Sequence, residues 1–262
     1  MRVCLLILVA AVFLSSGCMQ RYYNLATGSE ETYVYSSERE ARMGESLSRQ
    51  VEQVMKPVPD ALIQQRVNEI GQKIARISGR QEITYHFMVL DVKDKNAFAL
   101  PGGYVYIFRG LWDDIADQDD KIAAVLAHEV AHVSARHSIK RLQHNMTYGV
   151  LGILVNTPVA DMDSQSRAQA SAGISELLLD YSREEELESD TLSVQYLERS
   201  GYNSAAVIDV LHKLQDIQRA LPVGPQHALT HPYITDRVSS VTAQMKEGAI
   251  EFDDYINTTK KQ

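Results

Sequence analysis

The segment that most constrains this chain is an apolar, alanine-rich stretch that carries two histidines and a glutamate. It reads KIAAVLAHEVAHV from Lys121 to Val133, a pattern that predicts a buried helix. Positions four apart on a helix lie about 40° apart around its axis, so His128 and His132 share one face, with Glu129 beside them. Burying such polar groups costs on the order of a few kcal/mol unless partners satisfy them. The fold must therefore supply those partners.

The spacing of these residues is the H-E-x-x-H pattern of zinc enzymes. In that pattern two imidazoles bind the metal, and the glutamate handles the proton of a water molecule beside it. A chance pair of polar residues in a helix is the alternative. We predict one Zn²⁺ per chain, with His128 and His132 as ligands and Glu129 as the catalytic base.

Two further histidines follow, and we expect neither to reach the metal. His137 lies nine residues after His128, about 180° around a continuous helix, and should point away from it. The longer metzincin motif would need glycine at 135 and histidine at 138, where this chain has Ala135 and Ser138. We therefore expect His137 and His144 to lie on the surface.

A zinc site needs a third protein ligand, and an acidic stretch near residue 185 offers several. In LLLDYSREEELESD, Glu186 and Asp190 are four apart and share a face that also carries leucines. Glu184 and Glu188 have the same spacing further round the helix. Spacing leaves both pairs open, and a solvated acidic face accounts for the remaining carboxylates.

The rest of the chain predicts a mostly helical domain with a small β element. Ser36 and Asp60 are typical amino-terminal caps, and Leu62 begins an apolar stripe through Val67. Pro101-Gly102-Gly103 should break regular structure. We read 156–173 as a mobile loop or a weak helix. We expect helices over 36–55, 61–78, 119–139, 174–200, 204–219 and 232–246, and strands over 83–90 and 104–108.

The amino terminus predicts export. MRVCLLILVAAVFLSSGC has a positive charge at Arg2 and an apolar run that is short for a transmembrane span. Cys18 after LSSG resembles the lipobox of bacterial lipoproteins, although Ser15 stands where leucine is usual. That resemblance implies a lipid anchor on Cys18 and, since Met19 follows, the outer membrane. An uncleaved signal anchor is the alternative.

Composition narrows the classes of protein that remain. A net charge of −8 without a basic stripe argues against nucleic-acid binding. Both cysteines lie in the exported segment, so the mature domain forms no internal disulfide. We divide the chain into a signal peptide with a lipobox-like end over 1–18, a tether over 19–35 and a single domain over 36–262.

Four segments together resemble a known family. NAFALPGGYVYIFRGL, LAHEVAHVSARHS, YSREEELESD and THPYITDR follow the order found in zinc metallopeptidases such as the heat-shock protease HtpX and the CAAX prenyl proteases. The chain resembles the soluble periplasmic lipoprotein branch. This implies an α+β zincin-like (gluzincin) fold, mostly helical, with a small mixed β-sheet whose edge strand lies above the metal helix.

The resemblance also implies roles for particular segments. PGGYVYIFRGL corresponds to the family's edge strand, which can hold an extended peptide by main-chain hydrogen bonds. Its two glycines either let a substrate backbone come close or simply make the turn. The transmembrane helices of the prenyl proteases are absent, and the end at Gln262 leads us to expect no helical-repeat domain.

The family pattern selects Glu186 as the third zinc ligand. Asp190, four residues later, becomes its carboxylate neighbour, which orients an imidazole and is sometimes assigned as a proton donor. Ser189 stands where the family usually has alanine. His231 in THPYITDR matches a family histidine that reaches the metal or the transition state; alternatively, it only starts a helix.

Taken together, the resemblance implies a zinc-dependent endopeptidase of the cell envelope. It would hydrolyse peptide bonds of unfolded or misassembled envelope proteins in the periplasm. The alternative is a chaperone-like holdase or assembly factor for outer-membrane proteins with a latent metal site. A purely structural zinc with four fixed ligands is a third possibility. The site residues are Glu129, Asp190 and His231 as catalytic groups, and His128, His132 and Glu186 as metal ligands.

Overall fold

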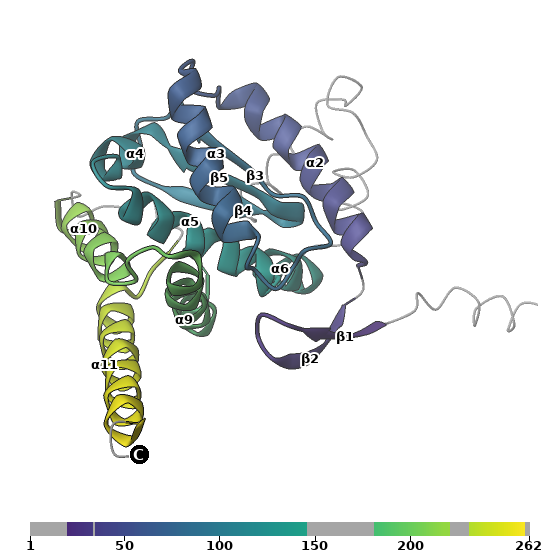
Figure 1. Cartoon of the computed structure of the whole chain (residues 1–262). Coiled ribbons are helices and arrows are strands. Elements are labelled where there is room, and N and C mark those ends of the chain that lie inside the picture. Colours follow the sequence, from purple (N-terminus) through teal and green to yellow (C-terminus); the bar gives the residue numbers. More distant parts are fainter. Residues whose placement is uncertain (1–19, 34, 146–180, 221–230, 260–262) are drawn as a thin grey trace, which may run out of the picture.

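The computed structural model describes residues 20–33, 35–145, 181–220 and 231–259. The expected signal peptide and the segment 156–173 lie outside these ranges. In the described part a small mixed sheet is surrounded by helices, which confirms the mostly helical α+β prediction (Figure 1). Among those described residues, no helix combines the length and the apolar character needed to cross a membrane.

Three strands form the central sheet in the order β3-β5-β4, with β3 parallel and β4 antiparallel to β5. Side chains alternate along each strand, so Val105 and Ile107 face one layer of helices while Tyr106 and Phe108 face another. The strands are β3 (His86–Leu90), β4 (Ala97–Leu100) and β5 (Tyr104–Phe108).

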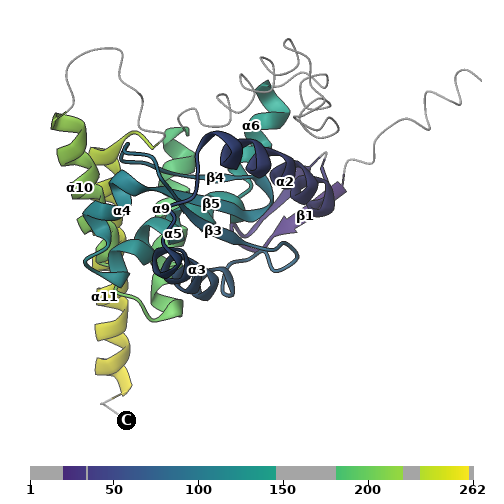
Figure 2. The same cartoon turned by 90° about the horizontal axis from the view of Figure 1, so that it is seen from above.

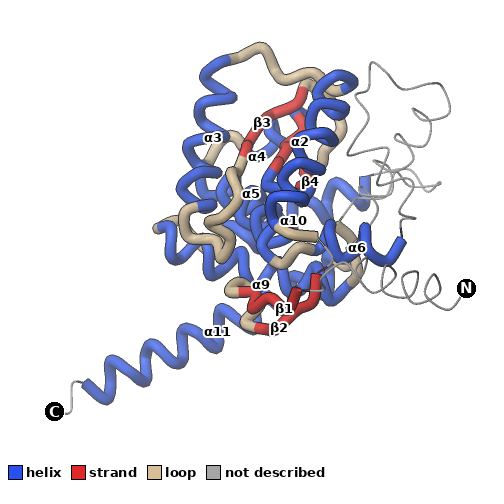
Figure 3. Tube along the Cα trace, turned by 90° about the vertical axis from the view of Figure 1, so that its right-hand side faces the viewer, coloured by secondary structure: helices blue, strands red, loops and turns tan. Residues whose placement is uncertain are grey.

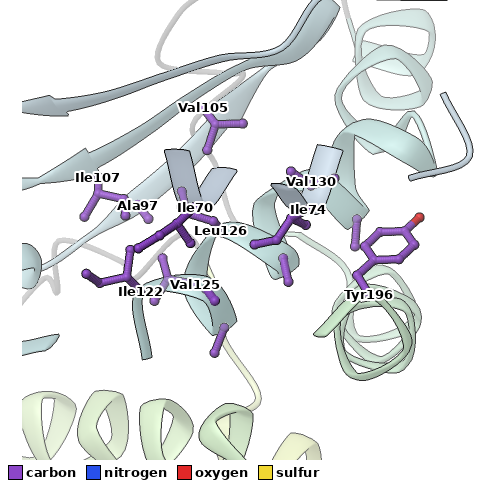
Figure 4. Packing of buried hydrophobic residues seen from close by; sticks show 14 of the residues in the cluster. Ile70, Ile74, Ala97, Val105, Ile107, Ile122, Val125, Leu126, Val130 and Tyr196 are labelled. Carbon is purple, nitrogen blue, oxygen red and sulfur yellow. The ribbon is translucent and has the colours of Figure 1, made fainter. Parts of the chain in front are cut away.

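The two faces of the sheet are covered by different helices. α2 (Ser37–Val54) packs on one face, with Met43 and Leu47 in the same cluster as the strand aromatics. α3 (Ala61–Ala75) and α5 (Asp119–Ser134) cover the other face, where Figure 4 shows their aliphatic side chains against those of the strands.

The expected helix starts are confirmed. The Ser36 hydroxyl accepts a hydrogen bond from the Arg39 amide, and the Asp60 carboxylate accepts from the amides of Leu62 and Ile63. Leu62 itself is 77% exposed, so the apolar stripe expected to include it begins later in the helix. The cap satisfies the backbone amides of the first turn by hydrogen bonds, and the side chains of that turn need not be buried.

Sequence reasoning placed the edge of the sheet on the wrong strand. The segment 104–108 is the central strand, and β3 and β4 form the two edges of this sheet. Sequence reasoning missed the four-residue β4, which contacts α5. Gly102 and Gly103 adopt φ values of 76° and 95° in a buried turn. A Cβ on Gly102 would lie 2.8 Å from Cα of Ala41, so these glycines admit this chain's own backbone rather than a substrate.

The helix predicted over 119–139 is also divided. α5 ends at Ser134, Arg136 has a left-handed φ of 57°, and α6 begins at His137. The direction of the chain therefore changes directly after the histidine motif. This break decides where the side chains that follow the motif can lie.

The remaining helices pack around α5. α9 lies along α5, and α10 contacts both α5 and α11. Seen from above, α10 lies beside α11 (Figure 2), and from the side α11 projects away from the body of the protein (Figure 3). Their bounds, with that of the short helix after β5, are α4 (Arg109–Ile115), α9 (Arg183–Ser200), α10 (Ala206–Ala220) and α11 (Ile234–Thr259).

Within the segment 19–35, expected to be a tether, the described residues 20–33 form a hairpin. Strands β1 (Gln20–Asn24) and β2 (Ser29–Tyr33) pair in an antiparallel hairpin. Asn24 is buried and its amide donates to the carbonyl of Ser134 over 3.2 Å, at the end of α5. The hairpin is thus tied to the helix that carries the histidine motif.

Candidate metal centre

Four side chains converge between α5, α9 and the segment before α11. Each contributes one ligand-type atom, and the four atoms lie within 4.8 Å of one another. Nε2 of His128 is 3.0 Å from Nε2 of His132, and Nδ1 of His231 is 2.9 Å from Oε1 of Glu186. All four residues are buried. The capping box at Ser182 starts α9, and the Glu186 carboxylate lies 3.4 Å from Nε2 of His128 and 3.5 Å from Nε2 of His132.

The chemistry of this cluster fits a zinc ion. Two imidazole nitrogens that approach to 3.0 Å repel through their lone pairs unless a proton or a cation lies between them. Three histidines and a carboxylate are the nitrogen and oxygen donors that zinc prefers. Glu129 Oε2 is buried beside the cluster without a hydrogen-bond partner among the described residues. Such an atom calls for a proton-carrying partner that the described residues do not supply.

His128 is held from behind by a buried charged pair. Its Nδ1 lies 2.9 Å from Oδ1 of Asp190, and both oxygens of Asp190 accept hydrogen bonds from the Arg237 guanidinium over 2.8 Å. Arg237 also approaches Glu186 Oε2 to 2.6 Å. Arg237 closes the segment THPYITDR, but sequence reasoning gave it no role, because its burial becomes visible only when α9 and α11 are brought together.

These charges set the protonation of the cluster. Burial opposes ionisation of Asp190 and Glu186, yet Arg237 and the neighbouring histidines outweigh it and lower the pKa of both carboxyls. Burial and Arg237 also disfavour protonation of His128, but hydrogen bonds to Asp190 and Glu186 raise its pKa to about 9. A metal that binds His128 therefore displaces a proton from it.

His132 has different neighbours. Its Nδ1 lies 2.8 Å from Nδ1 of His137, whose Nε2 lies 2.9 Å from Oε2 of Glu188. Tyr181 stacks on the His132 ring with the ring centres 3.7 Å apart. The expectation that His137 is a surface residue is therefore wrong: it is 1% exposed, since the helix breaks before it. The side chain of His144 lies outside the described residues.

Glu129 lies beside the cluster rather than in it. Its Oε1 is 3.3 Å from Nε2 of His231. Burial raises the pKa of Glu129, against the opposing influence of His231 and His128. His231 precedes the first residue of α11, Ile234, and is 7% exposed. A histidine that only started the helix would not contact the carboxylates of both Glu129 and Glu186.

A cavity opens next to Glu129 and His128. It is partly open to solvent, and its lining is mostly apolar. Ala97 of β4 and Val125 of α5 line it together with a row of aliphatic residues on α10. The site therefore combines a compact polar cluster with an apolar recess beside it.

Comparison with known proteins places this geometry in a family. The model of peptidase family M48 matches residues 61–245, which contain all the residues of the cluster. The chain is 28% identical over 219 residues to the beta-barrel assembly-enhancing protease of Yersinia pestis, covering 81% of this chain and 45% of that protein. The Escherichia coli K12 protein of the same name is 28% identical over 210 residues, covering 77% and 42%.

A mitochondrial protein is similar as well. The metalloendopeptidase OMA1 of Schizosaccharomyces pombe is 25% identical over 185 residues, which cover 71% of this chain and 54% of that protein. The chain spans less than half the length of the bacterial proteins above. The match over 61–245 shows that this chain belongs to peptidase family M48, the zinc metallopeptidase family to which its motifs pointed.

Proposed function

We propose that this chain is a zinc-dependent endopeptidase in which His128, His132 and Glu186 hold the metal. The observation that carries the proposal is their convergence, from two helices more than fifty residues apart in the chain, beside the buried carboxylate of Glu129. Bound zinc lowers the pKa of a water molecule and stabilises the negative charge that develops on the scissile carbonyl oxygen.

Glu129 is the base in this proposal. Its raised pKa brings it closer to neutral pH, where a general base works best, and one of its oxygens has no other hydrogen-bond partner in the described structure. It takes a proton from the attacking water and passes it to the leaving amine. Asp190, whose pKa is lowered and whose oxygens bind Arg237 and His128, orients His128 rather than donating a proton.

His231 occupies the place of a fourth donor. A zinc held by all four residues would have no open position for water, so a catalytic site would be held by His128, His132 and Glu186 without His231. A purely structural zinc predicts that His231→Ala weakens zinc binding strongly. A catalytic zinc site predicts that this variant retains zinc and leaves the fourth position around the metal to water. Zinc titration of the wild-type protein and of His231→Ala distinguishes the two cases.

The substrates we propose are unfolded or misassembled polypeptides of the cell envelope. β4 is an edge strand, a position at which an extended peptide can pair, and the cavity beside Glu129 offers an apolar recess for one of its side chains. The bacterial relatives are named as beta-barrel assembly-enhancing proteases. We propose the periplasm as the location, with a lipid on Cys18 as an anchor to the outer membrane. A protease name on these relatives favours cleavage over a holdase role.

The decisive experiment compares wild-type protein with Glu129→Gln on a casein-like unfolded substrate. The amide keeps the shape of the side chain but cannot take up the proton. Cleavage should fall by at least about 10²-fold, the scale of general-base catalysis, while zinc content stays at one per chain. Chelation should abolish wild-type cleavage. Equal cleavage by both proteins would show that the base assignment is wrong.

A further inference from the structure

Behind His132, on the side away from the donor cluster, a histidine and a glutamate form a hydrogen-bonded chain. Nδ1 of His132 is 2.8 Å from Nδ1 of His137, and Nε2 of His137 is 2.9 Å from Oε2 of Glu188. We propose that His137 is a positioning residue which, backed by Glu188, fixes the tautomer and the direction of His132 as a zinc ligand. This inference rests on the proposed zinc site.

The ring hydrogens of His132 and His137 can be placed without conflict. Nε2 of His132 faces Nε2 of His128 and Oε1 of Glu186, so it is the nitrogen available to a metal. A neutral imidazole that offers Nε2 carries its hydrogen on Nδ1, and that hydrogen is donated to Nδ1 of His137. His137 then carries its own hydrogen on Nε2 and donates it to the Glu188 carboxylate. Every nitrogen has one consistent role.

A role for His137 as another metal ligand does not fit this geometry. Its Nδ1 meets the rear nitrogen of His132, and the donor cluster of the described residues does not include it. A purely space-filling role leaves the partners unexplained, since His137 is 1% exposed and yet reaches a carboxylate that is 38% exposed. The Ser189 hydroxyl, 3.4 Å from Nδ1 of His137, is at most a weak additional partner.

The hydrogen-bonded series from His132 through His137 to Glu188 forms only because α5 ends before His137. In a continuous helix, residues five apart point about 140° away from each other, so His137 could not meet His132. The left-handed Arg136 turns the chain back, and the two rings come to lie 5.0 Å apart. That conformation is strained for a residue with a side chain. The Ser37 hydroxyl, 2.6 Å from the Arg136 guanidinium, and the Tyr33 ring, 4.4 Å away, hold it in place.

The test compares zinc affinity and metal geometry across four variants. His137→Ala removes the acceptor, whereas His137→Asn keeps an oxygen acceptor near the position of Nδ1. Glu188→Ala removes the carboxylate behind it, and the matched control, Glu184→Ala, removes an exposed carboxylate from the same helix. Zinc dissociation constants come from chelator competition, and the visible absorption of the Co²⁺-substituted protein reports ligand geometry.

We expect His137→Ala to raise the zinc Kd about 10- to 100-fold and to alter the Co²⁺ spectrum. His137→Asn should recover most of both, Glu188→Ala should show a smaller rise, and Glu184→Ala should match wild type. Equal defects in the Ala and Asn variants would mean that His137 only fills space, and wild-type affinity in His137→Ala would likewise overturn the inference.

Two further observations keep the result interpretable. If His137→Ala does not fold, judged by circular dichroism, the comparison of Glu188→Ala with Glu184→Ala decides: equal zinc affinities overturn the inference. If the wild-type protein itself binds no zinc, the proposed function fails together with this inference. If it binds zinc and cleaves, and the His137 variants match it, the positioning role alone fails.

Discussion

The two imidazoles of α5 are supported in opposite ways. His128 is backed by a carboxylate and a guanidinium, Asp190 and Arg237, which belong to α9 and α11 and are almost completely buried. His132 is backed by a second imidazole, that of His137, and by a partly exposed carboxylate. The difference teaches that one histidine motif can depend on a charged network that joins helices and, one turn later, on a local break in its own helix.

The largest expected effect tests the charged side. Arg237→Met should leave Asp190 and Glu186 as buried carboxylates without their cation, which costs about 3–5 kcal/mol of unfolding free energy. The matched control is Arg183→Ala, which breaks the half-exposed pair with Asp236 between the same two helices and should change the stability little, because solvent screens that pair. Denaturant unfolding of the metal-free proteins measures both. Similar costs would remove the contrast between the buried and exposed pairs.

Zinc should tighten both sides of the site at once. Because the ion binds only the folded chain, free zinc at about a thousand times its Kd should add about 4 kcal/mol to the stability of the wild-type protein. A chelator should remove this added stability and lower the midpoint of thermal unfolding accordingly. A midpoint that does not respond to zinc would show that the donor cluster is held together without the metal.

The smallest expected effect is a dependence on pH that distinguishes the two sides. Asp190 has a lowered pKa in the folded protein, so its stabilising contribution is present above its ordinary pKa and is lost as pH falls through the lowered value. Without Arg237, only His128 opposes the effect of burial on this carboxyl, so its pKa is higher than in the wild-type protein. The cost of Arg237→Met should therefore shrink as pH falls from 7 towards 4, as unfolding at a series of pH values will show. A constant cost would contradict this linkage.

Periodicity and capping predicted much of this architecture. Ser36 and Asp60 begin their helices, and the faces of α5 and α9 that carry the donors are buried, because local rules govern both features. The turn at Arg136 was not predictable, since its partners Ser37 and Tyr33 lie about a hundred residues earlier in the chain. No local sequence pattern predicts the left-handed conformation of Arg136.

Other misses have similar origins. The four residues of β4 are all buried and show no alternation, so they carry no strand pattern. Arg237 could not be recognised as an internal cation without the carboxylates that face it from another helix. Spacing alone also left the pair Glu184 and Glu188 open beside Glu186 and Asp190. The family pattern selected Glu186, but only the fold shows that Glu188 lies behind His137.

The left-handed Arg136 has a consequence for where the peptidase unit begins. The match to the family starts at residue 61, yet the groups that hold this arginine, Tyr33 and Ser37, precede that point. Glu40, also upstream, accepts from Arg80 over 2.8 Å and lies 3.6 Å from Arg136 in the same buried network. A shortened chain starting at the family boundary would keep every metal donor and still lose the clamp that shapes their surroundings.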